Sequence, residues 1–210
     1  MTATETYQEL ADLGSATVYE AGGRGGYVDA DLIQVIPGRR VAGPARTVLC
    51  GQDDNLMVHA AMAAVQPGEV LVLTMPEPRP VALVGDLLAT QAKAQGAAAI
   101  LVDASIRDLE ELAELDLPIW ARWVRVKGAR KDIPGSIGEP VTVGGATIRT
   151  GDVLVLDADG VAIVEPERVG EVLEASRERE KRERVKRLKL QAGELSYDLD
   201  GLRERVETTS

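Results

Sequence analysis

Apolar and polar positions alternate in blocks between residues 80 and 126, and the blocks predict alternating strands and helices. PVALV (80–84) is a short apolar run typical of a strand, and helical spacing follows it at 87–95. AAAILVDA (97–104) is apolar except for Asp103, as in a strand buried on both faces, and 108–115 again has helical spacing. IWARWVRV (119–126) adds a third strand. Strands and helices in alternation with short joints predict a parallel βαβ sheet with right-handed crossovers, and therefore an α/β fold.

The segments on either side of this block predict further helices and strands. Helical spacing covers Tyr7–Tyr19 and Asp53–Val65. The region 140–166 is rich in β-branched residues, with turn signals at Gly144-Gly145 and Asp159-Gly160. Further short apolar runs that predict strands are Leu32–Ile36, Arg46–Cys50 and Glu69–Thr74.

The C-terminal part of the chain predicts a helical arm. Residues 167–192 form one helical pattern, about 39 Å long at 1.5 Å per residue. Its centre, REREKRERVKR (177–187), has little apolar face, so we expect it to lie in solvent. Apolar residues return at Leu195, Tyr197, Leu199 and Leu202. We therefore divide the chain into a core, 1–166, and an arm, 167–210, whose tip docks on a neighbouring subunit; a frayed terminal helix is the alternative.

Composition excludes several classes of protein. Of 210 residues, 45% are hydrophobic and 28% are charged, which excludes a disordered chain. No apolar run reaches the ~18 residues of a membrane span, and MTATETYQEL lacks the pattern of a signal peptide, so we expect a cytoplasmic protein without a membrane partner. Residues 1–164 carry 13 basic and 22 acidic side chains and no phenylalanine, which disfavours binding to nucleic acid.

The same composition restricts the chemistry of any metal site. The chain has one cysteine, Cys50, and one histidine, His59, so it cannot build a Cys/His zinc cluster. Any metal site must use mainly oxygen ligands, which favours a hard cation such as Mg²⁺ or Mn²⁺.

Charged residues follow two neighbouring strands of the predicted parallel sheet. The strand 80–84 leads into Gly85 and Asp86; the strand 97–104 delivers Asp103 and then Arg107 and Asp108. The carboxyl ends of parallel strands share one edge of a sheet, so these residues should meet at one rim. There a guanidinium can grip a carboxylate, an aspartate can ligate a hydrated cation, and the first amides of the next helix, at Leu87 and Leu88, can face an anion.

A purely structural interpretation of these residues is also available. Asp86 and Asp108 could each cap the helix that follows, and Arg107 could pair with either aspartate. Spacing alone does not separate this interpretation from a binding site.

The segment VGDLLATQAKAQGAAAILVDASIRD carries a D-x20-R-D motif, Asp86 to Arg107-Asp108. With this motif the chain resembles the 4-hydroxy-4-methyl-2-oxoglutarate/4-carboxy-4-hydroxy-2-oxoadipate aldolases, relatives of the RraA-type regulators of ribonuclease E. Further segments that carry the resemblance are YEAGGRGG (19–26), DNLMVHAA (54–61), PIWARWVRVKG (118–128), GDVLVLDADGVAIV (151–164) and RLKLQAGELSYDL (187–199). The resemblance implies an RraA-like swivelling α/β/β sandwich assembled as a homotrimer or homohexamer. It also implies that the arm, which the short regulators lack, marks an aldolase.

The resemblance assigns roles to individual residues. Asp108 is expected to be the one direct protein ligand of the divalent cation, and Arg107 to hold the oxygen at C2 of the substrate's pyruvyl part. The backbone across Gly85, Asp86, Leu87 and Leu88 is expected to bind the pyruvyl carboxylate, and Glu194 to reach the site of a neighbouring subunit. Supporting positions around the site are expected at Asn55, His59 and Glu20.

The implied activity is that of a lyase, a class II pyruvate aldolase in the breakdown of aromatic compounds. Its substrate would be 4-hydroxy-4-methyl-2-oxoglutarate or 4-carboxy-4-hydroxy-2-oxoadipate, with oxaloacetate decarboxylation as a side activity. Either reaction leaves an enolate that a cation or a lysine Schiff base must stabilise; none of the lysines before the arm lies inside an apolar strand, which favours the cation. A water positioned by Asp86 is the expected base. The alternative function is a non-catalytic regulator that binds ribonuclease E.

The chain departs from the aldolase pattern in two places. KGA (127–129) and GSIG (135–138) stand where aldolases have QGT and GSVN. The half of the substrate beyond the pyruvyl part is therefore left open by the sequence.

Overall fold

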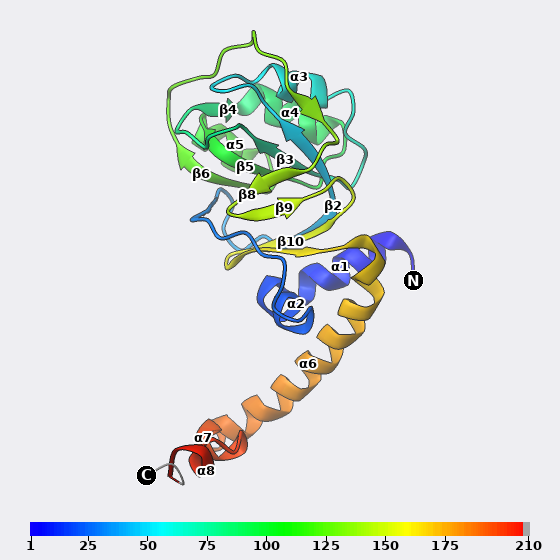
Figure 1. Ribbon diagram of the computed structural model, residues 1–210, viewed down its shortest axis with the longest axis vertical. Coiled ribbons are helices and arrows are strands. Elements are labelled where there is room, and N and C mark those ends of the chain that lie inside the picture. Colours follow the sequence, from blue (N-terminus) through cyan, green and yellow to red (C-terminus); the bar gives the residue numbers. More distant parts are fainter. Residues whose placement is uncertain (208–210) are drawn as a thin grey trace.

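The computed structural model describes residues 1–207, and a curved sheet forms its centre (Figure 1). Within those residues nine strands pair in the order β1–β6–β5–β3–β2–β10–β11, with β4 beside the end of β5 and β7 beside β2. The strands β2 to β6 that pair with one another are parallel, and β1, β7, β10 and β11 are antiparallel to their neighbours. The sheet strands are β1 (Ile33–Gln34), β2 (Val41–Leu49), β3 (Val70–Thr74), β4 (Ala82–Val84), β5 (Ala99–Ile106), β6 (Ile119–Val124), β7 (Ser136–Ile137), β10 (Val153–Asp157) and β11 (Gly160–Val164).

Two layers cover the parallel part of the sheet, because successive side chains of a buried strand point to opposite faces. Ile100 and Val102 of β5 pack in a core with α3 (Leu56–Ala61), α4 (Asp86–Ala94) and α5 (Leu109–Glu114). Ala99 and Leu101 pack in a second core with the hairpin β8 (Val141–Val143) and β9 (Ala146–Ile148). The chain is therefore an α/β/β sandwich with a parallel βαβ core, as predicted.

The single N-terminal helix expected over Tyr7–Tyr19 is wrong. The chain forms α1 (Ala3–Leu13) and α2 (Ser15–Ala21), separated by Gly14, whose φ of +86° interrupts the helix. The carboxylate of Asp157 accepts hydrogen bonds from the backbone N–H of Ser15 at 2.7 Å and from its hydroxyl at 2.5 Å. A carboxylate from β10 thus caps a second helix that local spacing does not reveal.

The predicted arm is present. A 3₁₀ turn (Pro166–Arg168) leads into α6 (Val169–Gln191), followed by α7 (Ser196–Leu199) and α8 (Leu202–Glu207). Only the first turns of α6 pack on the body: Val172 and Leu173 are buried in a core with α1 and α2. The rest of α6 extends away from the body, and Leu188 and Leu195 are more than half exposed (Figure 1). Residues 208–210 of the predicted arm lie outside the described part of the chain.

None of the described helices is both long enough and apolar enough to cross a membrane.

Candidate functional site

The structure brings the two predicted strand ends together. β4 and β5 are parallel neighbours, and Val84 is in register with Ile106. The chain therefore leaves both strands at the same edge, with Gly85 and Asp86 beside Arg107 and Asp108. The backbone N–H of Asp86 donates a hydrogen bond to Oδ2 of Asp108 at 3.2 Å. Of the charged residues predicted at this rim, Asp86, Arg107 and Asp108 lie together.

Asp108 is held in an unusual backbone conformation. Its φ of +60° and ψ of +47° lie in the left-handed region, which costs a non-glycine residue about 1–2 kcal/mol. Its side chain makes no capping hydrogen bond to α5, and neither Gly85 nor Asp86 supplies a side-chain cap to α4. Neither aspartate therefore caps the helix that follows it, and that part of the structural interpretation is wrong. The predicted pair between Arg107 and an aspartate is present, with Asp108, and the Asp108 carboxylate instead accepts from the first N–H of α4. Strained residues of this kind concentrate at functional sites.

Arg107 is positioned between two glycines. Its Nε lies 3.5 Å from Oδ2 of Asp108, and its side chain is about half exposed. A Cβ atom at Gly85 would lie 2.3 Å from Asp108 Oδ2 and 3.2 Å from Arg107 Nε, and one at Gly128 would lie 2.9 Å from Arg107 Nη1. The backbone at residue 85, with φ −134°, is open to any residue, so a larger side chain there would act by displacing the Asp108 carboxylate. Gly128 was not predicted, because it belongs to a segment that returns to the site from beyond β6.

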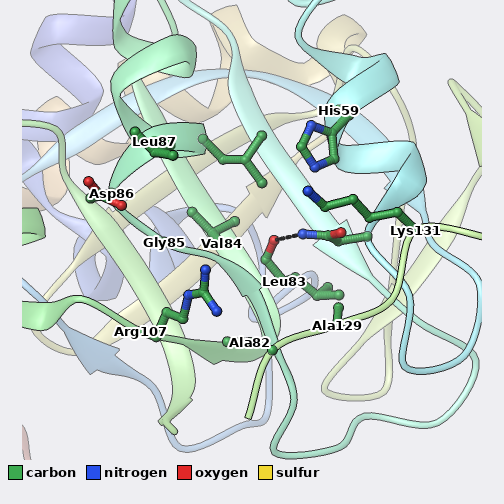
Figure 2. Close-up of a pocket in the computed structure, with 13 residues that line it drawn as sticks. His59, Ala82, Leu83, Val84, Gly85, Asp86, Leu87, Arg107, Ala129 and Lys131 are labelled. Atoms are coloured by element: carbon green, nitrogen blue, oxygen red, sulfur yellow. Dashed lines mark hydrogen bonds between the residues drawn. The ribbon is translucent and has the colours of Figure 1, made fainter. Parts of the chain in front are cut away.

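Gly85, Arg107 and Gly128 border a pocket that continues across the end of β4, and Asp108 lies next to its lining residue Arg107 (Figure 2). Leu87 and Leu88, in the first turn of α4, line one side, where the opening amides of a helix lack acceptors within it. A small anion placed there would face these amides and the positive end of the helix dipole.

The opposite side of the pocket comes from α3 and the segment 128–131. Figure 2 shows the Lys131 amino group beside the His59 ring, across the pocket from the Arg107 guanidinium. Burial and the positive charge of Lys131 both lower the pKa of His59, so the imidazole is held neutral near pH 7. Lys131 was not predicted as a site residue.

Asn55 also lines this side of the pocket. It is 8% exposed, and its Nδ2 donates a hydrogen bond to the Leu83 carbonyl at 3.0 Å. Its Oδ1 has no partner among the described residues. A buried, unpaired acceptor is costly unless a ligand or water supplies a donor, so Asn55 is suited to receive one from a bound molecule.

The donor set suits a hard, hydrated cation. In the part of the chain that the structure describes, no three His, Cys, Asp or Glu side chains are arranged to hold a metal ion. The rim instead offers the carboxylates of Asp86 and Asp108, both oxygen donors. Mg²⁺ is commonly held by one or two carboxylates, with waters and substrate completing its shell. Carboxylates of this kind could hold the hydrated divalent cation that the D-x20-R-D motif implies.

Three predicted residues lie elsewhere. Asp103, expected at the rim, is buried on the opposite face of β5 and is paired with Arg122. Glu20 is on α2, where it pairs with Arg24 at 2.9 Å and lies 3.5 Å from Arg179. Glu194 follows α6 and is exposed; its expected place is the site of a neighbouring subunit, which stays a prediction. The position of Asp103 follows from the alternation of side chains along β5, because the odd-numbered residues of this strand face the layer of the β8–β9 hairpin.

Fold and site together define an α/β/β protein with a pocket at the edge of a parallel sheet. The chain belongs to the RraA-like family: the family model described as Aldolase/RraA matches residues 9–163. It is 37% identical over 141 residues to a Halalkalibacterium halodurans protein named "Putative 4-hydroxy-4-methyl-2-oxoglutarate aldolase", covering 67% of each chain.

Two solved RraA proteins share the fold. Streptomyces coelicolor RraAS2, described as an unusual member of the RNase ES inhibitor RraA protein family, is 30% identical, with a TM-score of 0.79 over 90% of this chain and 100% of that one. The RNA-processing inhibitor RraA from Thermus thermophilis is 26% identical, with a TM-score of 0.66 over 72% of this chain and 92% of that one. Coverage of 90% extends beyond residues 1–166, so the arm alone does not separate aldolases from RraA proteins.

Proposed function

We propose that the protein is a class II pyruvate aldolase that cleaves a 4-hydroxy-2-oxo acid with a further carboxylate at C4 and releases pyruvate. The substrates that fit this chemistry are 4-hydroxy-4-methyl-2-oxoglutarate and 4-carboxy-4-hydroxy-2-oxoadipate. The observation that carries the proposal is the meeting of Gly85-Asp86 with Arg107-Asp108 at one sheet edge. The relationship to a named aldolase supports the same class of reaction.

The reaction breaks the bond between C3 and C4. The C4 hydroxyl loses its proton and becomes a carbonyl, while the bond electrons pass to C3 and the C2 oxygen as an enolate. A divalent cation, when bound beside Asp108, acts as a Lewis acid for that charge. Arg107 donates hydrogen bonds to the C2 oxygen, and the amides of Leu87 and Leu88 hold the C1 carboxylate. Asp86 positions the water that takes the hydroxyl proton, and protonation at C3 then gives pyruvate.

The far side of the pocket supplies recognition of the second carboxylate. Lys131 offers a charged donor, and Asn55 offers an unpaired acceptor for the C4 hydroxyl. Oxaloacetate places a carboxylate on the carbon next to the ketone, and its loss as CO₂ yields the same enolate. Oxaloacetate decarboxylation is therefore the side activity that this site would support.

A neighbouring subunit completes the proposed site. The exposed arm would carry Glu194 to the rim of an adjacent copy in a homotrimer or homohexamer. Support comes from Leu195 and Leu202 at its tip, which are exposed in the single chain. The remaining parts of the proposal are a cytoplasmic location, a small-molecule 2-oxo acid as partner, and no nucleic-acid or membrane partner.

The second candidate is a non-catalytic, RraA-like regulator of ribonuclease E. The likeness to RraAS2 over 90% of this chain favours it. The pocket beside Arg107 and the relationship to a named aldolase lead us to place catalysis first.

Pyruvate release tests the proposal directly. The protein is incubated with Mg²⁺ and each of the two branched substrates or oxaloacetate, and pyruvate is followed with lactate dehydrogenase and NADH. Pyruvate must form with the wild type, and Arg107→Ala must lower kcat/KM by about 10²–10³-fold, the usual effect of removing a donor to an oxyanion. No pyruvate above background, together with binding to a ribonuclease E scaffold, would establish the regulator instead.

A Schiff-base mechanism predicts a different result, because Lys131 lines the pocket. Borohydride added with pyruvate would then trap a covalent adduct on this lysine, detectable by mass spectrometry. The cation mechanism predicts no adduct, together with inhibition by EDTA.

A further inference from the structure

Asp54 is a buried carboxylate outside the proposed catalytic residues. It is fully buried, directly before Asn55 at the start of α3. Its Oδ1 accepts a hydrogen bond from the Leu56 N–H at 2.8 Å, and its Oδ2 accepts from the N–H groups of Asp132 at 2.6 Å and Ile133 at 3.0 Å. One carboxylate therefore joins two segments that are almost 80 residues apart in sequence.

The segment that Asp54 holds is the one that carries Lys131. Backbone hydrogen bonds fix its beginning against β4: the Ala82 N–H donates to the Lys127 carbonyl at 2.7 Å, and the Ala129 N–H donates to the Ala82 carbonyl at 3.2 Å. Its middle is held by the Asn55 N–H, which donates to the Arg130 carbonyl at 2.8 Å. The bonds to Asp54 fix the residues directly after Lys131.

The charged state of Asp54 is maintained although it is buried. Burial raises its pKa, but the hydrogen bonds from Asp132, Leu56 and Ile133 and the nearby charge of Arg130 lower it by more. A carboxylate with several amide donors is a rigid anchor, because each donor must find a new acceptor if the segment moves.

We propose that Asp54 is a positioning residue that sets the location of Lys131 in the pocket and thereby the enzyme's preference for substrates with a second carboxylate at C4. This inference rests on the proposed function for its effect on substrates. The structural part of the inference, that Asp54 sets the placement of Lys131 beside His59, does not depend on the proposed function.

Kinetics test the effect on substrates. Asp54→Asn keeps the shape of the side chain but replaces one acceptor with a donor. KM for 4-hydroxy-4-methyl-2-oxoglutarate should rise about tenfold, as expected for weakening one charged contact, with kcat changed less than about twofold. KM for 4-hydroxy-2-oxopentanoate, which lacks the C4 carboxylate, should not change.

Two matched variants separate positioning from general loosening. Asp152→Asn alters another buried carboxylate that accepts a backbone N–H, from Arg149 at 2.7 Å, and should leave both KM values unchanged. Lys131→Met should raise KM for the dicarboxylic substrate as Asp54→Asn does. Combining Asp54→Asn with Lys131→Met should add nothing further. Equal KM increases for both substrates, or additive effects in the double variant, would overturn the proposal.

The placement itself is tested without any activity. His59 is the only histidine in the chain, so one NMR resonance reports its pKa. Removing the negative charge of Asp54 alone would lower this pKa, whereas moving Lys131 away must raise it. A rise in Asp54→Asn supports the proposal even if the wild type releases no pyruvate, and an unchanged or lower value contradicts it.

The wild-type protein provides a further measurement if Asp54→Asn does not fold. The amides of Asp132 and Ile133 should be strongly protected from hydrogen exchange, because their acceptor is buried. Exchange as fast as in an open loop would overturn the proposal.

Discussion

The left-handed backbone of Asp108 leads to a prediction about stability as well as activity. We compare Asp108→Gly with Asp108→Ala. Both variants lose the carboxylate and its hydrogen bond with the Asp86 N–H, so that loss cancels between them. The remaining difference comes from the backbone at φ +60°, ψ +47°.

The size of this difference follows from two opposing effects. Alanine in the left-handed region costs about 1–2 kcal/mol relative to glycine. Glycine in turn stabilises the unfolded chain through its greater freedom, by about 0.4–1 kcal/mol. The midpoints of these two ranges, about 1.5 and about 0.7 kcal/mol, leave Asp108→Gly more stable than Asp108→Ala by about 0.8 kcal/mol. In a chain of this length that is a Tm difference of about 1–4 °C.

Urea unfolding at one protein concentration measures the difference, with pyruvate release measured in parallel. Both variants should lose metal-dependent activity, so the more stable one is no more active. Asp116 has a φ of +57°, lies outside the pocket and serves as the control. Asp116→Gly should likewise be more stable than Asp116→Ala, with activity unchanged. Equal stability of the two Asp108 variants would refute the argument that this residue is strained.

Three further predictions concern the pocket and its surroundings. Gly85→Ala places a Cβ 2.3 Å from Asp108 Oδ2, so kcat/KM should fall by more than about 100-fold in the pyruvate assay while circular dichroism stays native; retained activity would contradict the tight contact. Lys131→Met removes a positive charge that disfavours the imidazolium, so the pKa of His59 followed by NMR should rise, and a fall would contradict this assignment. Burial and the charge of Asp54 raise the pKa of Cys50 to about 12, so its thiol should stay unmodified by dithiobis(2-nitrobenzoate) at pH 8 until urea unfolds the protein; rapid labelling of the folded chain would show that the thiol is accessible.

The parts of the fold that sequence predicts well are those set by nearby residues. The βαβ block between 80 and 126 follows from periodicity, and its parallel arrangement alone brings Asp86 to Arg107 and Asp108. The break at Gly14 could not be predicted in the same way, because the carboxylate that caps the second helix comes from Asp157.

The other side of the pocket depends on contacts between distant segments. Gly128 and Lys131 reach the site only because β4 and Asp54 hold the returning chain, and local patterning carries no sign of this. The left-handed conformation of Asp108 is likewise invisible in sequence. Asp103 was predicted at the rim because it is charged and close to the end of its strand. The prediction is wrong, because its side chain lies on a buried face of the sheet.

The central claim is that Asp108 and a divalent cation together enable cleavage of the bond between C3 and C4. The most direct measurement is the initial rate of pyruvate release from 4-hydroxy-4-methyl-2-oxoglutarate by metal-stripped protein, before and after addition of Mg²⁺ or Mn²⁺, for the wild type and Asp108→Asn. We predict a background rate without metal, recovery of wild-type activity on adding either cation, and no recovery in the variant. Full activity in excess EDTA, or a variant as active as the wild type, would contradict the account.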